Sequence, residues 1–295
     1  MVNFLGITEC KDYLAVPYDV SSGSGAAPVP IEPPYPALVE SHFEWLALLQ
    51  SVVEYAQAAG HDESNRPFTM IELGAGFGRW LANAAGALRS IIAENGSPAR
   101  LSAPRLIAVE AEPQHYEWIA QHLADNDIAF DPADLHWAAS APSDGEVMFY
   151  CGASAAWWGQ EIVRPHRRQV RHVEGRPVGQ LRVPALSLTT LLRGLTEVDL
   201  IDADIQGAEF EVFSAAGAAL DRCVGRIIVA THHREVEASL RDFMERDLRW
   251  TCEMDFAGGG INDTPVGPIR FEDGLQVWRN PQFLRRSGPL PAANH

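Results

Sequence analysis

The feature that most constrains the fold of this chain is a glycine-rich turn directly after a short apolar segment. Residues 68–73 read FTMIEL, and Gly74, Gly76 and Gly78 follow in a G-x-G-x-G spacing. Glycines at a strand-to-helix turn adopt positive φ angles and let a ligand approach the backbone closely. Arg79 stands where the dinucleotide fingerprint G-x-G-x-x-G requires its last glycine. The turn therefore predicts a strand, a ligand-binding loop and a helix.

The chemistry around this turn favours S-adenosylmethionine (SAM) over a dinucleotide. A pyrophosphate favours a tight turn aimed at the N-terminus of a helix, whereas SAM carries no phosphate. The acidic Glu72 before the glycines suits a ligand that bears an ammonium and a sulfonium group. The turn therefore indicates a methyltransferase first and a nicotinamide-dependent sugar oxidoreductase as the alternative.

The remainder of the chain alternates between apolar strands and amphipathic helices. This order predicts an α/β fold with a mostly parallel sheet covered by helices on both faces. Strands are expected over 68–73, 105–110, 136–139, 146–151, 198–204, 226–230, 250–256 and 275–279. Helices are expected over 38–59, 79–95, 113–126, 186–195, 209–219 and 236–246.

Three parts follow from this pattern. Residues 1–66 form an N-terminal arm and helix, with a Ser-, Gly-, Ala- and Pro-rich loop at 21–36. Residues 67–280 form the ligand-binding domain, and residues 281–295 form a loose tail. Residues 157–182 are expected to be irregular. Within them the basic run 164–172 is either a solvated surface loop or a lid over the substrate.

Composition restricts the partners. A formal charge of −16 argues against nucleic acid and anionic membranes, because both bind basic surfaces. No apolar run approaches the roughly 20 residues of a membrane span, and the N-terminus lacks a secretory pattern. The four cysteines are scattered and are expected to be reduced thiols. We therefore expect a cytoplasmic protein with a small-molecule or oligosaccharide acceptor, and the Pro-rich arm is a candidate homodimer contact.

Polar side chains gather where the predicted strands end, and ligands of open α/β sheets bind at the carboxyl ends of strands. Glu110 ends the second strand and is placed to accept hydrogen bonds from the hydroxyls of a ribose. Small residues around Ala139 leave room for an adenine. Trp157 and Trp158 are candidates for stacking on sugar rings, with core packing as the competing explanation.

The fourth and fifth predicted strands end in titratable groups. Asp202, Asp204 and Glu209 follow a strand that should be buried, where an unpaired charge is costly unless it binds something. Helix capping by Asp204 and Glu209 is the alternative explanation, but it does not account for Asp202. His232 and His233 end the next strand, and a histidine has a suitable pKa to accept a proton near neutral pH. These groups also suit a divalent ion.

The run DLIDADIQGAEFEVF resembles the signature of the FkbM-type methyltransferases, an apolar strand followed by Asp, an aliphatic residue, Glu or Gln, Gly, any residue and Glu. The matching positions are Asp204, Ile205, Gln206, Gly207 and Glu209. The resemblance continues in order through ELGAGFGRW, AVEAEPQ, WAASAPSDGEVMFY and DGLQVWRN, from residue 68 to about 280.

This resemblance implies a Rossmann-like class I SAM-dependent methyltransferase with a seven-stranded sheet that methylates a sugar or natural-product hydroxyl. Related sugar O-methyltransferases hold Mg²⁺ with acidic residues at the ends of strands four and five. This chain departs from that pattern, because His232 and His233 end its fifth strand. It departs again at Asp202, which replaces a residue that is commonly basic in the family.

We therefore expect SAM-dependent O-methylation of a sugar or oligosaccharide, a mycobacterial-type polysaccharide precursor being one candidate. His232 or His233 is the expected base. Asp204 and Glu209 are expected to position the acceptor or to hold Mg²⁺ together with His232. Cofactor contacts are expected from Glu72, Gly74, Gly76, Gly78, Glu110, Ala139 and Asp204.

Three alternatives stand beside this reading. A non-sugar natural product is an alternative acceptor. A nicotinamide-dependent sugar oxidoreductase needs a diphosphate site, which Arg79 disfavours. A non-catalytic SAM- or sugar-binding module would tolerate replacement of both histidines.

Overall fold

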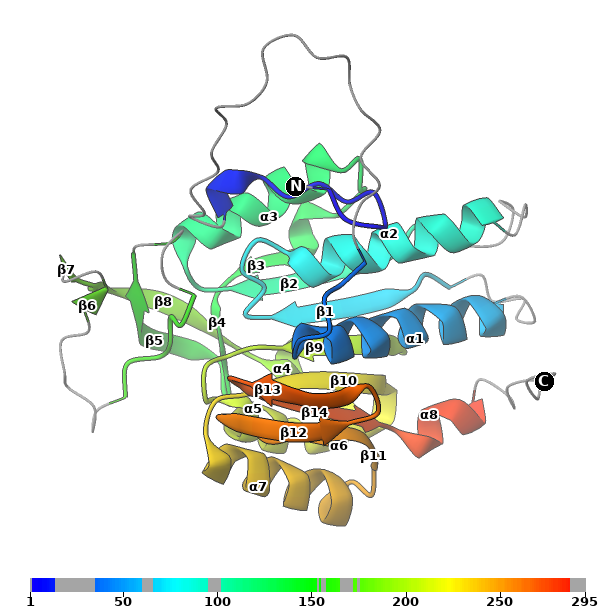
Figure 1. Cartoon of the computed structure of the whole chain (residues 1–295). Coiled ribbons are helices and arrows are strands. Elements are labelled where there is room, and N and C mark those ends of the chain that lie inside the picture. Colours follow the sequence, from blue (N-terminus) through cyan, green and yellow to red (C-terminus); the bar gives the residue numbers. More distant parts are fainter. Residues whose placement is uncertain are drawn as a thin grey trace, which may run out of the picture.

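The structure, a computed structural model, describes residues 2–13, 35–59, 66–94, 102–152, 154, 158–164, 172–173 and 176–286, and all structural statements below concern these residues. A seven-stranded sheet forms the centre of the molecule, in the order β11-β14-β10-β9-β1-β2-β3 (Figure 1). Its strands are β1 (Thr69–Leu73), β2 (Arg105–Glu110), β3 (Leu135–Trp137), β9 (Val198–Ala203), β10 (Val224–Thr231), β11 (Thr251–Phe256) and β14 (Gly274–Arg279).

The sheet is parallel except at one edge. β3, β2, β1, β9 and β10 run parallel, and β14 runs antiparallel to both of its neighbours, β10 and β11. The first residue of β14, Gly274, pairs with the last residue of β10, Thr231. The loop before β14 therefore lies at the same edge as the carboxyl ends of the parallel strands. The predicted mostly parallel seven-stranded α/β fold is confirmed.

Helices cover both faces of this sheet. α1 (Ser41–Ala59), α2 (Arg79–Glu94) and α3 (Pro113–Asp125) pack on one face, and α1 lies beside α2 (Figure 1). The other face packs against α4 (Leu188–Leu191), α5 (Glu209–Ala215), α6 (Gly217–Cys223) and α7 (Arg234–Asp242). Burial of apolar side chains on both faces explains why the central strands are almost continuously apolar.

The N-terminal residues belong to the same core. Ile7 is fully buried against α2, and Asn126 of the α3 C-terminus accepts a hydrogen bond from the backbone of Thr8 at 2.7 Å. α1 buries Phe43 and Leu48 in the cluster that also holds residues of β1, β2 and β9. The predicted packing of this helix against the main domain is therefore confirmed. The predicted 21–36 loop lies outside the described residues except for its last two positions.

A smaller sheet branches from the central one. It has the order β4-β8-β5, with β4 (Ala139–Ala141), β5 (Gly145–Cys151) and β8 (Gly179–Ser187), and it stands to one side of the central sheet (Figure 1). The predicted third strand at 136–139 is therefore two strands, one in each sheet. Two-residue strands β6 (His172–Val173) and β7 (Arg176–Pro177) form a further pair.

Two predicted helices are wrong in extent. The expected helix at 186–195 is only the single turn α4, because residues 186 and 187 still belong to strand β8 and residues 192–194 form a turn. Ser187 then caps α4 by accepting the backbone N–H of Thr190. The expected helix at 209–219 is divided into α5 and α6 at Ala216, where Gly217 packs closely against Phe243.

Other elements lie outside the predicted pattern. A hairpin, β12 (Gly260–Thr264) and β13 (Gly267–Phe271), packs beside α1 through Phe271 and Phe43. The short turns Lys11–Tyr13 and Pro132–Asp134 and the π-turn Phe243–Asp247 complete the pattern. The expected loose tail begins with α8 (Pro281–Arg286). None of the helices in the described part of the chain is both long and apolar enough to cross a membrane.

Candidate functional site

The glycine loop after β1 has the predicted backbone geometry. Gly74, Gly76 and Gly78 have φ angles of 73°, 54° and 72°. A side chain at Gly74 would place its Cβ 1.9 Å from the carbonyl oxygen of Asp204. The absence of a side chain therefore lets the loop after β1 lie directly against the loop after β9. These two loops meet at the carboxyl edge of the sheet.

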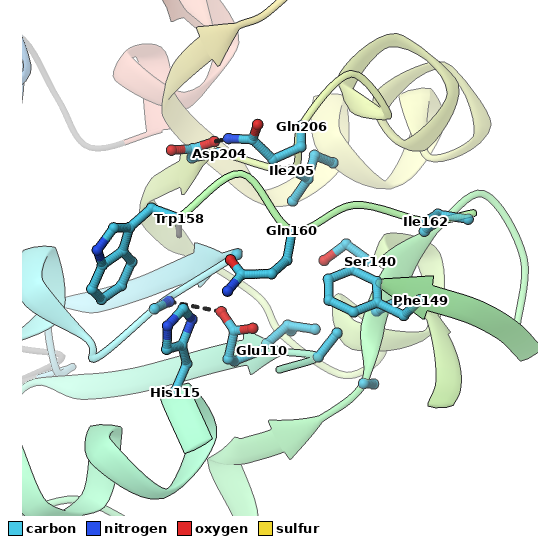
Figure 2. A pocket seen from close by; sticks show the side chains of 16 residues that line it. Glu110, His115, Ser140, Phe149, Trp158, Gln160, Ile162, Asp204, Ile205 and Gln206 are labelled. Carbon is cyan, nitrogen blue, oxygen red and sulfur yellow. Dashed lines mark hydrogen bonds between the residues drawn. The ribbon is translucent and has the colours of Figure 1, made fainter. Parts of the chain in front are cut away.

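A cleft opens beside these loops, with a volume of about 600 Å³ that includes space open to solvent. Figure 2 shows its lining, which comes from the ends of β1, β2, β4 and β9 and from the segment after β5. The lining residues are Gly74, Gly76, Val109, Glu110, Ala111, His115, Ala138, Ala139, Ser140, Phe149, Trp158, Gln160, Ile162, Asp204, Ile205 and Gln206.

Glu110 faces this cleft and is fixed by two backbone donors. Its Oε2 accepts the N–H of Gly76 at 2.8 Å (Figure 2). Its Oε1 accepts the N–H of Glu112 at 2.7 Å. Burial raises the pKa of Glu110 to about 7, although both N–H donors act in the opposite direction. Each carboxylate oxygen keeps a second lone pair, so Glu110 is placed to accept ligand hydroxyls.

Ser140 and Gln160 add polar groups to the cleft opposite the glycine loop. Ser140 is 7% exposed, and its hydroxyl has no hydrogen-bond partner among the described residues. Gln160 also lines the cleft, and Figure 2 shows its side chain extending toward the side of the cleft that holds Glu110. A buried hydroxyl without a partner is unfavourable, so the cleft suits a ligand that hydrogen-bonds there.

Trp158 closes one side of the cleft. Its ring stacks on His115 with 4.3 Å between centroids and 11° between planes. A Cβ on Gly76 would lie 3.0 Å from the same indole. His115 is held in turn by the carbonyl of Ser154 at 2.8 Å, and Ser154 Oγ donates to Glu112 at 2.9 Å. The indole therefore lies against the glycine loop, and Trp157 is outside the described residues.

Two of the predicted cofactor contacts do not line the cleft. Glu72 is 3% exposed, and its carboxylate accepts the N–H groups of Trp80 and Leu81 at the start of α2. Burial raises the pKa of Glu72 to about 8, with those two hydrogen bonds opposing the shift. Gly78 packs against Ile119 of α3. Glu72 therefore anchors α2 beneath the loop, and a direct contact with the cofactor stays a prediction.

A second group of polar side chains adjoins the cleft at Asp204. The ring of His232 lies between two carboxylates, with Nε2 3.3 Å from Asp204 Oδ1 and Nδ1 3.2 Å from Glu209 Oε1. The amide of Gln206 lies 2.7 Å from both Asp204 Oδ1 and His232 Nε2. Asp273, from the loop before β14, lies 3.8 Å from His232 Nε2. The predicted association of Asp204, Glu209 and His232 is therefore present.

The protonation states in this group follow from its charges. Burial disfavours a charged His232 ring, but the hydrogen bond to Glu209 and the charges of Asp204, Glu209 and Asp273 outweigh it and raise the pKa of His232 to about 9. The side chain of Asp204 is 49% exposed but lies within the concave site. There burial raises the pKa of Asp204 to about 6, against the influence of His232 and Gln206. Near pH 7 the histidine carries a proton and the aspartate is mostly ionised.

His233 has a different environment from His232. It precedes α7, and its ring lies 3.1 Å from the position that a Cβ on Gly207 would occupy. It does not line the cleft. Arg164, the first residue of the basic 164–172 run, donates to the carbonyl of Gly207 at 2.6 Å. The role of His233 as a base stays a prediction without support from its position.

The predicted Mg²⁺ ligands do not converge on one point. Asp204 and Glu209 approach opposite nitrogens of the His232 ring. Glu209 is fully buried, and its Oε1 also accepts the N–H of Gly207 at 2.9 Å. No group of three or more His, Cys, Asp and Glu side chains with the spacing of a metal site occurs in the described ranges. Because Mg²⁺ demands near-octahedral oxygen ligation, this arrangement does not fit the predicted metal site.

The fold and the site together define a class of protein. A sheet with this strand order, with a glycine loop after β1 and an acid at the end of β2, is a class I methyltransferase-type α/β fold. A family model described as the methyltransferase FkbM domain matches residues 74–256, more than half of the chain. The chain therefore belongs to the FkbM methyltransferase family.

The chain is also similar to individual proteins. A protein of Jannaschia sp. (strain CCS1), provisionally named a methyltransferase, is 28% identical over 241 residues, which cover 81% of this chain and 78% of that protein. The FkbM methyltransferase structure from Methylobacillus flagellatus KT is 13% identical, with a TM-score of 0.40, covering 80% of this chain and 58% of that chain. An O-methyltransferase from Bacillus cereus in complex with SAH is 12% identical, with a TM-score of 0.40 and 82% coverage of each chain. The fold assignment itself rests on the strand order.

Proposed function

We propose that the protein is a SAM-dependent O-methyltransferase that acts on a hydroxyl of a sugar or oligosaccharide. The observation that carries this proposal is the position of Asp204. It lines the cleft beside the glycine loop and also contacts the His232–Glu209 pair. One side chain therefore joins the cleft beside the glycine loop to a group of proton-binding residues.

The cleft fits the adenosyl part of SAM, which supplies a methyl group on a sulfonium when it is bound. Glu110 is the group that would accept the ribose hydroxyls, because its oxygens already face the cleft in a fixed orientation. The unpartnered hydroxyl of Ser140 and the amide of Gln160 would face the adenine. Gly74 and Gly76 would leave room for the methionine part.

Asp204 is the proposed general base. A hydroxyl is a weak nucleophile unless a positioned group removes its proton as the C–O bond forms. The raised pKa of Asp204, about 6, makes it a stronger base than an ordinary aspartate while leaving it mostly ionised near pH 7. His232 is protonated under the same conditions, so it does not accept the proton. Instead its Nε2 lies 3.3 Å from Asp204 Oδ1 and holds the carboxylate in place.

Glu209 positions His232 in this scheme. It is fully buried, and its Oε1 accepts from both Gly207 N and His232 Nδ1. An acceptor on Nδ1 fixes the ring, so that Nε2 is presented to Asp204. Asp204, Gln206 and Asp273 then supply several hydrogen-bonding groups at one place, which suits an acceptor with several hydroxyls.

The experiment is transfer of labelled methyl from SAM to a panel of mono- and oligosaccharides, with hydroxylated non-sugar natural products included. Label in a sugar ether that resists mild base supports the proposal. Label only in the non-sugar compounds keeps the methyltransferase and removes the sugar. Oxidation of a sugar with NAD⁺ in place of methyl transfer would contradict the proposal altogether.

A further inference from the structure

We propose that the N-terminal segment, residues 2–13, positions the glycine loop and thereby raises the affinity of the cleft for SAM. This inference rests on the proposed function in one respect, namely that the cleft holds SAM. The segment lies outside residues 74–256, which match the family model. None of residues 2–13 lines the cleft, so the segment acts through the residues that it contacts.

The N-terminal segment lies across α2 and α3 (Figure 1). Ile7 is fully buried, and its side chain lies 2.9 Å from the position that a Cβ on Gly86 of α2 would occupy. The backbone N–H and the hydroxyl of Thr8 both donate to Asn126, directly after α3, at 2.7 Å and 2.9 Å. These contacts fix the segment on both helices, so that residues 9–13 reach the glycine loop in a defined position.

The glycine loop depends on its surroundings for order, because glycines give it little stiffness of its own. Gly74, Gly76 and Gly78 all have positive φ angles, and glycine loses more conformational freedom on ordering than any other residue. A ligand that has to order its own binding loop binds less tightly. Phe77 is the large side chain of this loop, and it is 4% exposed. It is therefore the point at which neighbouring elements can hold the loop.

The N-terminal segment holds Phe77 in two ways. The ring of Tyr13 stacks on the ring of Phe77, with 4.9 Å between centroids and 24° between planes. The fully buried His122 of α3 places Nδ1 3.0 Å from the carbonyl oxygen of Phe77 and Nε2 3.1 Å from that of Thr8. Burial lowers the pKa of His122, so near neutral pH its ring donates one of these hydrogen bonds at a time. The stack of Tyr13 on Phe77 is therefore the constant contact.

Aromatic contacts continue from Tyr13 to the wall of the cleft. Phe77 meets Trp158 edge to face, with 5.7 Å between centroids and 75° between planes. The ring of Trp118 lies 5.1 Å from Tyr13 and 6.4 Å from Trp158. Trp158 lines the cleft, and a Cβ on Gly76 would lie 3.0 Å from its indole. Removal of the Tyr13 ring should therefore loosen both the loop and the cleft wall beside it.

A charged contact fixes the end of the glycine loop. Arg79, the first residue of α2, pairs with Glu9 of the N-terminal segment at 3.1 Å. The side chain of Glu9 is 10% exposed, so solvent screens this pair less than it screens a pair on the open surface. The segment thus contacts Phe77 within the loop and also the residue directly after the loop.

The test is calorimetric binding of S-adenosylhomocysteine to the full-length protein and to its Tyr13→Ala variant. We expect the dissociation constant to rise about tenfold in Tyr13→Ala, as the loss of an aromatic stack and of its buried area predicts. Tyr13→Phe is the matched control. It keeps the ring and removes a hydroxyl that has no hydrogen-bond partner among the described residues, so it should bind as the wild type does.

Hydrogen exchange in the cofactor-free protein tests the cause of this change. The peptide that contains residues 74–78 should exchange faster in Tyr13→Ala than in the wild type or in Tyr13→Phe, because local opening of the loop then costs less free energy. A peptide from α6, on the opposite face of the sheet, should exchange at the wild-type rate. Equal exchange of the loop peptide in all three proteins would overturn the inference.

A milder variant serves if Tyr13→Ala does not fold. Glu9→Gln keeps the shape of the side chain and removes its charge, and it should raise the same dissociation constant by about two- to fivefold. Wild-type affinity in Glu9→Gln would then overturn the inference.

The remaining controls separate the possible failures. Leu220→Ala removes a fully buried side chain of α6, so it should lower the melting temperature without changing the affinity for S-adenosylhomocysteine. An equal loss of affinity in Leu220→Ala and Tyr13→Ala would overturn the inference, because general destabilisation would explain both. Failure of S-adenosylhomocysteine to bind the wild type would contradict the proposed function itself. Wild-type affinity in a folded Tyr13→Ala would overturn only the role of the N-terminal segment.

Discussion

The two halves of the sheet's carboxyl edge are built on different principles. At the ends of β1 and β2, the carboxylates of Glu72 and Glu110 accept backbone N–H groups and form a rigid support. At the ends of β9 and β10, Asp204, His232 and Asp273 face one another, with few backbone donors between them. The first half is therefore suited to hold a constant ligand, and the second is suited to proton transfer and to selection of the acceptor.

The largest expected effect is on the rate of methyl transfer when the proposed base, which belongs to the second half, is removed. Asp204→Asn keeps the shape of the side chain but does not accept a proton, so methyl transfer should fall by about 10²- to 10⁴-fold. Binding of S-adenosylhomocysteine should change little. Rapid-quench measurement of labelled product and calorimetry check the two outcomes, with Asp263→Asn as a surface control. Wild-type rates in Asp204→Asn would exclude Asp204 as the base.

The next largest expected effect is on the affinity of the first half, at the ends of β1 and β2, for the cofactor. Glu110→Gln removes a charged acceptor and leaves one oxygen for two backbone donors. The dissociation constant for S-adenosylhomocysteine should rise by about 10- to 100-fold, as expected for hydrogen bonds to a charged group. Glu117→Gln, on the exposed side of α3, is the matched control. Unchanged affinity in Glu110→Gln would place the ribose elsewhere.

A smaller expected effect is on how the stability of the fold depends on pH, through Glu72, which anchors α2 beneath the glycine loop. Burial raises the pKa of Glu72 from 4.5 to about 8 in the folded protein. Because the folded protein holds this proton more tightly than the unfolded chain does, the contribution to stability is complete below about pH 4.5 and is lost as the pH rises to about 8. The melting temperature should therefore fall between about pH 4.5 and pH 8, by roughly a few degrees. Glu72→Gln should flatten this fall, whereas the exposed Glu146→Gln should not; equal slopes would contradict the assignment.

The smallest expected effect is that of metal removal. Because Asp204 and Glu209 approach different nitrogens of His232, we expect EDTA to change the rate of methyl transfer by less than about twofold. A loss of activity that Mg²⁺ restores would restore the metal role inferred from the resemblance. The second half, at the ends of β9 and β10, would then hold a metal ion in addition to its own side chains.

Much of the first half was predictable because its determinants are local. The spacing of Gly74, Gly76 and Gly78 requires a particular backbone, and Glu110 follows one apolar strand later. The identity of the strands followed from short apolar runs. Strand β8 was missed because its first residues, 179–182, belong to a segment of basic and irregular composition, which hid the alternation that continues through residues 183–187.

The second half was predictable only in part. The sequence places Asp204, Glu209 and His232 at neighbouring strand ends, and the structure brings them into contact. It does not reveal that buried Glu209 contacts His232 in a way that raises the pKa of the ring above neutrality. Nor does it reveal that Asp273, from the loop before β14, comes within 3.8 Å of His232 Nε2. Long-range packing decides both.

The first half is assigned cofactor binding and the second half proton transfer. The most direct test of this assignment is to measure single-turnover methyl transfer by Glu110→Gln and by Asp204→Asn over a range of SAM concentrations. We predict that Glu110→Gln approaches the wild-type rate at saturating SAM, because it lacks only affinity. Asp204→Asn should stay slow at every SAM concentration, because it lacks the base. Rescue of Asp204→Asn by SAM, or a rate in Glu110→Gln that stays low at saturation, would contradict the assignment of the two halves.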